Sequence, residues 1–195
     1  MAPATKQAAL TKLSKMSVMA RLSRQVARLF GAEDRRRRPL RQRRAAAALE
    51  WAYSLSDLGK PVDHGKWGMT PQTVNAYNGG LENKIVFPAG ILQAPFFDPA
   101  ADLAVNYGAI GAVIGHEISH GFDDQGRKID DTGKLRDWWT VEDAKRFEAQ
   151  AAVLGGQYGA YEPVPGMKIN PALTMGENIA DLAGLQVAYD AYHAR

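Results

Sequence analysis

Hydrophobic residues recur with helical spacing in several stretches of this chain, separated by segments rich in glycine, proline and aspartate. The most apolar stretch, residues 109–115, has no polar side chain, so a helix there would be hydrophobic on nearly every side and therefore buried. Thr140 and Asp143 form a helix-capping pattern at the start of another stretch. Helices are predicted over residues 5–16, 45–58, 107–121, 140–154 and 174–195.

Two short segments, residues 74–77 and 84–87, have the composition of β-strands. The sequence Asn78-Gly79-Gly80 between them is typical of a hairpin turn. Because the predicted helices far exceed these strands in length, the expected fold class is α+β and mainly α.

The apolar helix ends in His116-Glu117-Ile118-Ser119-His120. Residues i and i+4 lie on one face of a helix, so both imidazoles can approach a single ion, and Glu117 can reach a water molecule on that ion. Burying two histidines and a glutamate without partners is unfavourable, and a metal ion is the usual compensation. We therefore predict a zinc site. The alternative is a chance pattern with two hydrogen-bonded core histidines.

Two acidic clusters follow the motif, Asp123-Asp124-Gln125-Gly126 and Asp130-Asp131-Thr132-Gly133. Such clusters suggest calcium, but the spacing and the terminal glutamate of an EF-hand loop are missing. Aspartate and glycine are favoured in turns, so both clusters are interpreted as turns.

A catalytic zinc site normally has three protein ligands, and the third should come from another buried element. Glu177 and Asp181 share a helix face at i and i+4. An ordinary interpretation is also open, because Thr174 and Glu177 match a capping box and Asp181 could be solvated. Small residues favour the functional interpretation, since they allow another helix to approach closely: Gly176, Ala180, Ala183 and Gly184.

The positive charge of the chain is confined to one segment. Ten of the fourteen arginines lie in residues 21–44, which carry a formal charge of +8; the whole chain carries +3, so the other residues carry −5. Because like charges repel, residues 17–44 are expected to be disordered. The alternative is nucleic-acid binding, but no aromatic residue interleaves the run of residues 35–44 to stack on bases, which argues against a nucleic-acid partner.

The length of 195 residues fits one domain of ordinary size with an appendage. No run of apolar residues is long enough for a transmembrane helix, and the first residues lack the apolar core of a signal peptide. The chain as given is therefore expected to be soluble, with its compartment left open. Cysteine is absent, so any zinc must be held by histidine and carboxylate.

The histidine motif is followed downstream by Glu177-Asn178-Ile179-Ala180-Asp181, and further characteristic segments are residues 74–77, residues 85–93 and Gly121-Phe122-Asp123-Asp124. In this order and spacing, the motifs resemble those of the neprilysin and endothelin-converting-enzyme family of zinc endopeptidases, especially its bacterial oligopeptidase members. The resemblance covers about residues 45–195. It implies a zincin-like (thermolysin-like) catalytic core, one zinc ion per chain and hydrolysis of peptide bonds in oligopeptides.

The resemblance also implies roles for single residues. His116, His120 and Glu177 resemble the zinc ligands. Glu117 resembles the general base, which takes a proton from the water that zinc activates. Asp181 resembles the carboxylate that orients the His116 imidazole.

Substrate-binding residues follow from the same resemblance. Asn75 and Ala76 resemble the strand edge that holds the backbone of a peptide substrate. Three apolar residues fall where the family lines its hydrophobic S1′ pocket: Ile91, Phe96 and Val113. Ordinary core packing is the alternative for these three.

The chain departs from the family pattern at both ends. Family members carry a later histidine that stabilises the oxyanion and an arginine that anchors substrate; His193 and Arg195 stand in the wrong place to replace them. The large N-terminal helical portion that encloses the family's active site is also missing. Loss of an oxyanion donor typically reduces rates by roughly 10²–10³. We therefore expect a truncated, weakly active core, the alternative being an inactive zinc-binding or peptide-binding remnant.

Three parts are expected along the chain: a short helical remnant over residues 1–16, an arginine-rich segment over residues 17–44, and a partial zinc peptidase domain over residues 45–195. The middle part does not resemble the family, whereas both flanks do. One hypothesis is a local reading-frame disturbance, which the coding DNA would test.

Overall fold

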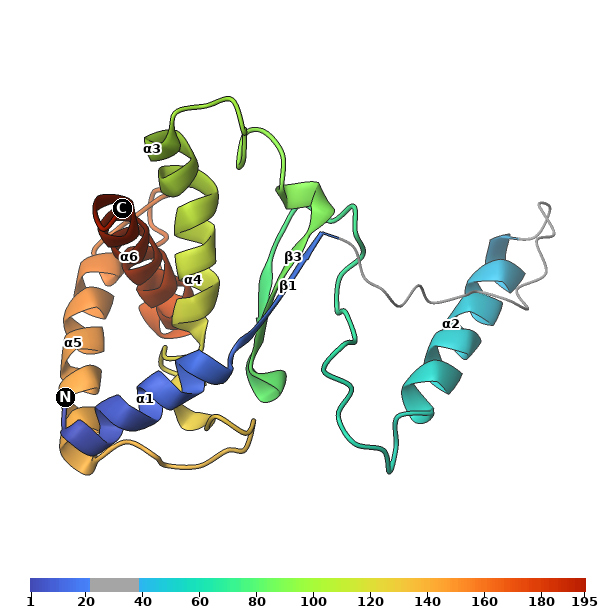
Figure 1. Ribbon diagram of the computed structural model, residues 1–195, viewed down its shortest axis with the longest axis horizontal. Coiled ribbons are helices and arrows are strands. Elements are labelled where there is room, and N and C mark those ends of the chain that lie inside the picture. The colour runs from blue at the N-terminus through green and yellow to red at the C-terminus, as the bar shows by residue number, and fades with distance from the viewer. Residues whose placement is uncertain (22–38) are drawn as a thin grey trace. The chain divides into compact units, whose positions relative to one another are not determined.

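The computed structural model describes residues 1–21 and 39–195, in a chain that divides into two compact units. The larger unit combines Met1–Leu22 with Met69–Arg195, and the smaller unit is Ser23–Gly68. In the larger unit a small sheet lies on one side and the helices lie on the other (Figure 1). The predicted class, α+β and mainly α, is confirmed.

The smaller unit contains helix α2 (Pro39–Leu55). This helix begins before residue 45, the predicted start, and so includes residues that were expected to be disordered. Leucine, arginine, glutamine and alanine have high helix propensity, and Pro39 stands in the first turn, where proline is tolerated. Residues 22–38 lie outside the described residues, so the remaining expectations for the arginine-rich segment stay predictions.

Three strands form the sheet: β1 (Ser17–Arg21), β2 (Tyr77–Gly79) and β3 (Lys84–Pro88), in the order β1-β3-β2. The central strand β3 is buried along its whole length and pairs antiparallel with β2. A hairpin of two strands was predicted here and is confirmed, but the first strand and the turn were placed too early. Residues 74–76 precede β2, and Asn78 and Gly79, which were predicted to form the turn, belong to the strand. A 3₁₀ turn, η1 (Gly80–Glu82), connects the two strands.

Strand β1 corrects the prediction that residues 17–44 are disordered from their first residue. It pairs in parallel with β3, with Val18 opposite Ile85, and the Ser17 N–H donates to the Asn83 carbonyl oxygen at 3.0 Å. The partner of a parallel strand is distant in sequence, so local charge and composition do not reveal the pairing. Helix α1 (Pro3–Lys15) and β1 therefore belong to the same unit as the histidine motif.

A continuous helical segment leads into the histidine motif. It consists of α3 (Leu103–Asn106), the π-helical turn η3 (Tyr107–Gly111) and α4 (Ala112–His120). Asp102 caps its start by accepting a hydrogen bond from the Ala104 N–H at 2.7 Å. The helix predicted over residues 107–121 is therefore confirmed, with an earlier start.

Two long helices follow. Helix α5 (Val141–Gly159) begins at the predicted cap, where Thr140 Oγ1 accepts a hydrogen bond from the Asp143 N–H at 3.2 Å. Helix α6 (Pro171–His193) begins earlier than predicted, with Asn170 as its cap, so the interpretation of Thr174 as a cap is wrong. Among the described residues, no helix is both long and apolar enough to span a membrane.

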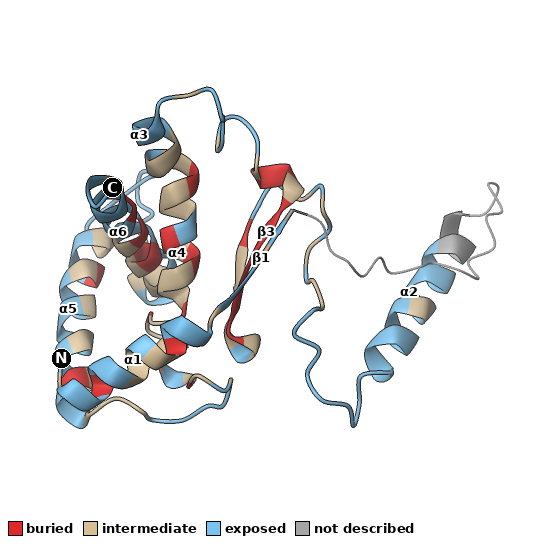
Figure 2. Cartoon of the chain, in the orientation of Figure 1, coloured by how far each residue is buried: buried red, intermediate tan, exposed pale blue. Residues whose placement is uncertain are grey.

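The hydrophobic core lies between the sheet and the helical segment that ends in α4. Figure 2 shows β3 and parts of α4 and α6 as buried. The buried cluster consists of Ala76, Ile85, Phe87, Ile91 and Ile110, and Met16, Leu92, Phe96, Val113 and Ile118 pack against it. This packing fixes α4 against the sheet and so sets the position of the histidine motif.

Candidate metal centre

Helix α4 presents two imidazoles on one face. The Nε2 atoms of His116 and His120 lie 2.9 Å apart, and the rings are perpendicular (90°) with centroids 4.5 Å apart. Each side chain is 19% exposed. The i, i+4 spacing therefore brings two ring nitrogens to one point that solvent can reach.

Helix α6 crosses α4 where two glycines meet. A Cβ on Gly115 would lie 2.5 Å from the Gly184 carbonyl oxygen, and a Cβ on Gly184 would lie 2.5 Å from the His116 backbone nitrogen. Both distances are far below van der Waals contact, so the backbones approach this closely only because neither residue has a side chain. The predicted close approach of another helix to the small residues of α6 is confirmed, and it brings Glu177 to α4.

Glu177 completes a cluster of three donor groups. Its Oε2 lies 3.3 Å from His116 Nε2 and 3.5 Å from His120 Nε2, and the ligand atoms of all three residues lie within 4.8 Å of one another. Two zinc bonds of about 2.1 Å at a tetrahedral angle separate their donors by about 3.4 Å. The two distances from Glu177 match this value, whereas the two imidazole nitrogens lie closer together, at 2.9 Å. Two imidazoles and one carboxylate are also a donor set of catalytic zinc sites, so these residues fit the ion.

Each imidazole is held at its other nitrogen by a carboxylate. Asp181 Oδ1 lies 2.8 Å from His116 Nδ1, and Asp123 Oδ2 lies 2.8 Å from His120 Nδ1. A carboxylate in this position favours the tautomer with the proton on Nδ1, which leaves a lone pair on Nε2 for a metal. The structure therefore brings Asp181 to the imidazole for which it was predicted.

Asp123 is a site residue that was not predicted. Its Oδ1 accepts hydrogen bonds from the N–H groups of Gln125 (2.9 Å) and Gly126 (2.6 Å), which confirms the predicted turn. Its Oδ2 is left to contact His120. The available signal was the i, i+3 spacing from His120, which places a carboxylate within reach of the last imidazole of the motif.

Burial and hydrogen bonding shift two pKa values in the site. The hydrogen bond that His120 Nδ1 donates to Asp123 Oδ2 raises the pKa of the His120 imidazole above its usual value, because it stabilises the imidazolium. Burial raises the pKa of the Glu117 carboxyl, against the opposing effect of the two histidines; Glu117 is only 5% exposed. The Glu117 backbone is also fixed, since its carbonyl oxygen accepts a hydrogen bond from Asn78 Nδ2 at 2.7 Å.

A cleft of about 420 Å³ lies beside the donor cluster. Asn75 and Ala76 line it, together with His116, Glu117, His120 and Glu177. The two residues predicted to hold a substrate backbone are therefore next to the donor cluster. The Ala76 N–H already donates to Asn75 Oδ1 at 2.9 Å.

Ile91, Phe96 and Val113 do not line this cleft. Ile91 is buried in the core, and the other two pack partly buried against the same cluster. This is the core-packing alternative, so a role of these residues in an S1′ pocket stays a prediction.

The arrangement of these groups is that of a zincin-like metallopeptidase core. Two histidines and a glutamate come from crossing helices, a buried glutamate directly follows the first histidine, and a sheet edge lies beside the cleft. Comparison with protein families agrees with this class. The model of "Peptidase family M13" matches residues 75–195. The chain belongs to this family, and the resemblance drawn from the motifs is confirmed.

Curated relatives share close to half of the matched residues. Endothelin-converting enzyme 1 of Bos taurus is 49% identical over 144 residues, which cover 74% of this chain and 19% of the relative. Neprilysin-3 of Drosophila melanogaster is 49% identical over 139 residues, which cover 71% and 18%. The chain therefore spans less than one fifth of the length of these relatives.

Solved structures confirm the fold. The crystal structure of the Mycobacterium tuberculosis zinc metalloprotease ZMP1 in complex with an inhibitor matches with a TM-score of 0.89 and 46% identity, over 100% of this chain and 30% of that chain. The structure of PEPO from Lactobacillus rhamnosis matches with a TM-score of 0.86 and 38% identity, over 98% and 30%. The predicted zincin-like catalytic core is thereby confirmed.

Proposed function

We propose that this chain supplies the zinc site of a metalloendopeptidase that hydrolyses peptide bonds in oligopeptides. The observation that carries the proposal is the convergence of His116 Nε2, His120 Nε2 and Glu177 Oε2, with both Nδ1 atoms held by carboxylates. Membership of peptidase family M13 supports the reaction type.

The three donor residues would hold one zinc ion per chain. When bound, zinc supplies a Lewis acid that polarises a substrate carbonyl and makes water more acidic. Asp181 and Asp123 keep the imidazoles in the required tautomer and orientation.

Glu117 is the proposed general base. It lines the cleft between the two histidines, and the burial that raises the pKa of its carboxyl makes it a better proton acceptor. In this role the carboxylate takes a proton from the attacking water and delivers it to the leaving amine. The hydrogen bond from Asn78 to its backbone fixes the base relative to β2.

We further propose that a peptide substrate binds along β2. This strand stands at an edge of the sheet, so its outer side can offer backbone groups to an extended peptide. Asn75 and Ala76 directly precede β2 and line the same cleft as the donor residues. The side-chain oxygen Oδ1 of Asn75 already accepts a hydrogen bond from the Ala76 N–H, which leaves the side-chain nitrogen Nδ2 to donate to a substrate carbonyl.

Zinc or peptide binding without catalysis is the second candidate function. The side chains of Glu177 and Asp181 are 67% and 72% exposed in the described structure. Access of water to a site weakens the electrostatic stabilisation of a transition state.

Metal content and peptide cleavage of purified protein test the proposal. We expect about one zinc ion per chain in the wild type and in Glu117→Gln, because the base is not a ligand. His120→Ala should lose tight binding, and Glu117→Gln should lose any chelator-sensitive cleavage. The matched control is His193→Ala, because His193 lies on α6 outside the cluster and contacts the Tyr189 carbonyl oxygen.

Equal metal loss in His120→Ala and Glu117→Gln would show that the roles of ligand and base are wrongly assigned. Stoichiometric zinc without cleavage in the wild type would favour the second candidate function.

A further inference from the structure

Lys12 of α1 carries a buried ammonium group that the proposed zinc chemistry does not use. The residue is only 1% exposed. Its Nζ donates to three backbone carbonyl oxygens, those of Gly121 at 2.6 Å, Gly126 at 2.9 Å and Ile129 at 2.8 Å. An ammonium group has three N–H donors, so each of them has an acceptor.

A buried cation is unfavourable unless its surroundings compensate for the lost water. Burial lowers the pKa of Lys12 from 10.5 to about 8, although three neighbouring carboxylates act in the opposite direction, those of Asp123, Asp130 and Asp131. The ammonium is therefore still charged at neutral pH. Its three hydrogen bonds are charge-assisted, which makes them stronger than bonds between neutral groups.

The three acceptors stand on both sides of Asp123 in the chain. They belong to the loop of residues 121–129, which directly follows His120 and contains the turn η4 (Gly126–Lys128). A Cβ on Gly126 would lie 1.8 Å from the His120 carbonyl oxygen, so this loop folds back tightly on the end of α4. A shift of this loop would carry Asp123 away from His120, and the three hydrogen bonds from Lys12 oppose such a shift.

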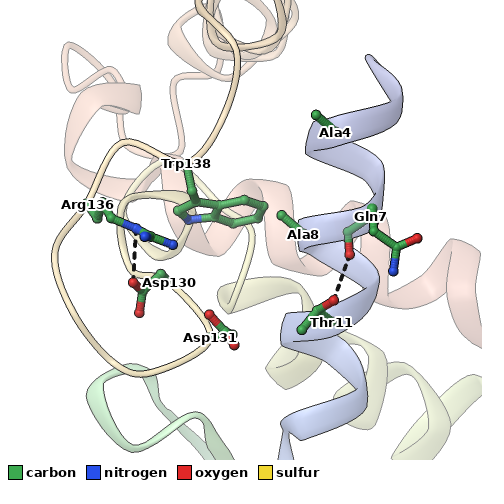
Figure 3. Close-up of a pocket in the computed structure, with 8 residues that line it drawn as sticks. All are labelled: Ala4, Gln7, Ala8, Thr11, Asp130, Asp131, Arg136 and Trp138. Carbon is green, nitrogen blue, oxygen red and sulfur yellow. Dashed lines mark hydrogen bonds and ion pairs between the residues drawn. The ribbon is translucent and has the colours of Figure 1, made fainter.

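The helix that carries Lys12 is itself held in place. Asn83 Nδ2 donates to the Lys12 carbonyl oxygen at 3.0 Å, and Trp138 Nε1 donates at 3.1 Å to the Ile129 carbonyl oxygen that also accepts from Lys12. Figure 3 shows the Trp138 indole beside α1, at a cavity of about 360 Å³. Lys12 therefore joins α1 to the loop from a fixed position.

We propose that Lys12 is a positioning residue for the metal centre: Lys12 holds the loop of residues 121–129 in place, and Asp123 in this loop orients the His120 imidazole. This inference rests on the proposed zinc site. Lys12 bonds to none of the three donor residues and meets the cleft only through the Gly126 and Ile129 carbonyl oxygens, so we expect it to act on the metal through the loop that carries Asp123.

Zinc affinity, measured by competition with a chromogenic chelator, tests this role. Lys12→Met should weaken zinc binding about 10–100-fold, the range typical for loss of a group that orients a ligand. The matched control is Lys15→Met, because Lys15 stands on the same helix with its side chain 54% exposed and paired with Asp131. This control should bind zinc as tightly as the wild type.

Double variants separate positioning from general destabilisation. If Lys12 acts through Asp123, adding Lys12→Met to Asp123→Asn should weaken zinc binding little further, because the same imidazole is already released. Adding Lys12→Met to Asp181→Asn should give the product of the two single effects, because Asp181 holds the other imidazole. Equal additivity in both pairs would overturn the proposal.

A chemical rescue keeps the proposal testable if Lys12→Met fails to fold. The sequence contains no cysteine, so Lys12→Cys creates a single thiol, which can be alkylated in denaturant before refolding. An aminoethyl group on this thiol restores an ammonium at nearly the original length and should recover zinc affinity, whereas an uncharged carbamoylmethyl group should not. Equal affinity of the two products would overturn the proposal.

The outcome also separates this inference from the proposed function. If the wild type binds zinc and Lys12→Met binds it equally tightly, only the role of Lys12 is contradicted. If the wild type binds no zinc, the metal centre and the role of Lys12 are contradicted together.

Discussion

The two imidazoles of the candidate metal centre lie one turn apart on one helix, yet they are held in different ways. His120 is held by Asp123, three residues further along the chain, whose side chain is 7% exposed. His116 is held by Asp181, which comes from another helix and is 72% exposed. One side of the centre is therefore local and buried, and the other side is long-range and open to solvent.

The difference shows that the metal centre needs two separate contacts, the packing of a loop against the end of α4 and the packing of α6 against α4. The His120 side depends on a loop that folds back on the end of α4 and is bonded to Lys12. The His116 side depends on the contact between Gly115 and Gly184, which sets the distance between α4 and α6. Damage to the helix crossing should remove Glu177 and Asp181 together, whereas damage to the loop should leave both in place.

The largest effect is expected for Gly184→Ala. The added Cβ would lie 2.5 Å from the His116 backbone nitrogen and 2.6 Å from the Ala112 carbonyl oxygen, so the two helices must separate. We expect a loss of about 3 kcal/mol in the free energy of unfolding, measured by chemical denaturation, together with loss of tight zinc binding.

The control for this variant is Gly156→Ala in α5, where a Cβ would meet nothing within 4 Å. It should be neutral or stabilise the protein by up to about 1 kcal/mol, because alanine is a better helix former than glycine. Similar stability losses in the two variants would show that the crossing is not the cause.

A second prediction compares the two carboxylates directly. Asp123→Asn should weaken zinc binding about 100-fold and Asp181→Asn about 10-fold, because a buried hydrogen bond to an imidazole is screened less by water than an exposed one. Chelator competition measures both affinities. The opposite order would mean that the exposed contact from α6 dominates the centre.

A third prediction concerns a contact through which α6 also reaches the His120 side. A Cβ on Gly176 would lie 2.9 Å from Asp123 Oδ2, the atom that contacts His120. Gly176→Ala should therefore displace this carboxylate and weaken zinc binding about tenfold. Gly108→Ala is the control, since a Cβ there has open space. Unchanged affinity in Gly176→Ala would show that Asp123 adjusts without releasing the imidazole.

The smallest effect is expected for Asp130→Asn, on how the free energy of unfolding changes at acid pH. Asp130 directly follows the loop of residues 121–129. Hydrogen bonds, first of all from the Thr132 hydroxyl, lower the pKa of Asp130 from 3.8 to about 2. A carboxyl with a lowered folded-state pKa contributes stability above pH 3.8 that is lost as the pH falls towards 2. Asp130→Asn should reduce this pH dependence in denaturation curves recorded between pH 5 and pH 2. Parallel curves for variant and wild type would contradict the assignment.

Local chemistry in the sequence predicted the parts of the site that lie within one helix. The apolar run before His116 predicted a buried helix, and the i, i+4 spacings predicted which side chains share a face. The start of α6 was misplaced because Thr174 matched a cap, although Asn170 and Pro171 offered an earlier one.

Contacts between distant segments were harder to predict. Strand β1 forms by pairing with β3, more than sixty residues further along the chain. Residues 17–21 were assigned to the arginine-rich segment beside them, so the strand was not predicted. The hydrogen bonds from Lys12 to the loop join residues more than one hundred positions apart in the sequence. Their acceptors are backbone oxygens, which every residue has, so no residue type in the loop indicates them. Asp123 was correctly predicted as a turn residue. Because the turn already accounted for an aspartate at this position, its second contact, with His120, was not predicted.

X-ray absorption at the zinc edge of zinc-loaded protein tests the central claim most directly. The account predicts two imidazole nitrogens at about 2.0–2.1 Å with the remaining donors oxygen. His120→Ala should reduce the imidazole signal or abolish binding, and His193→Ala should leave it unchanged. A zinc spectrum without two imidazoles, or one that changes in His193→Ala and not in His120→Ala, would contradict the metal centre described above.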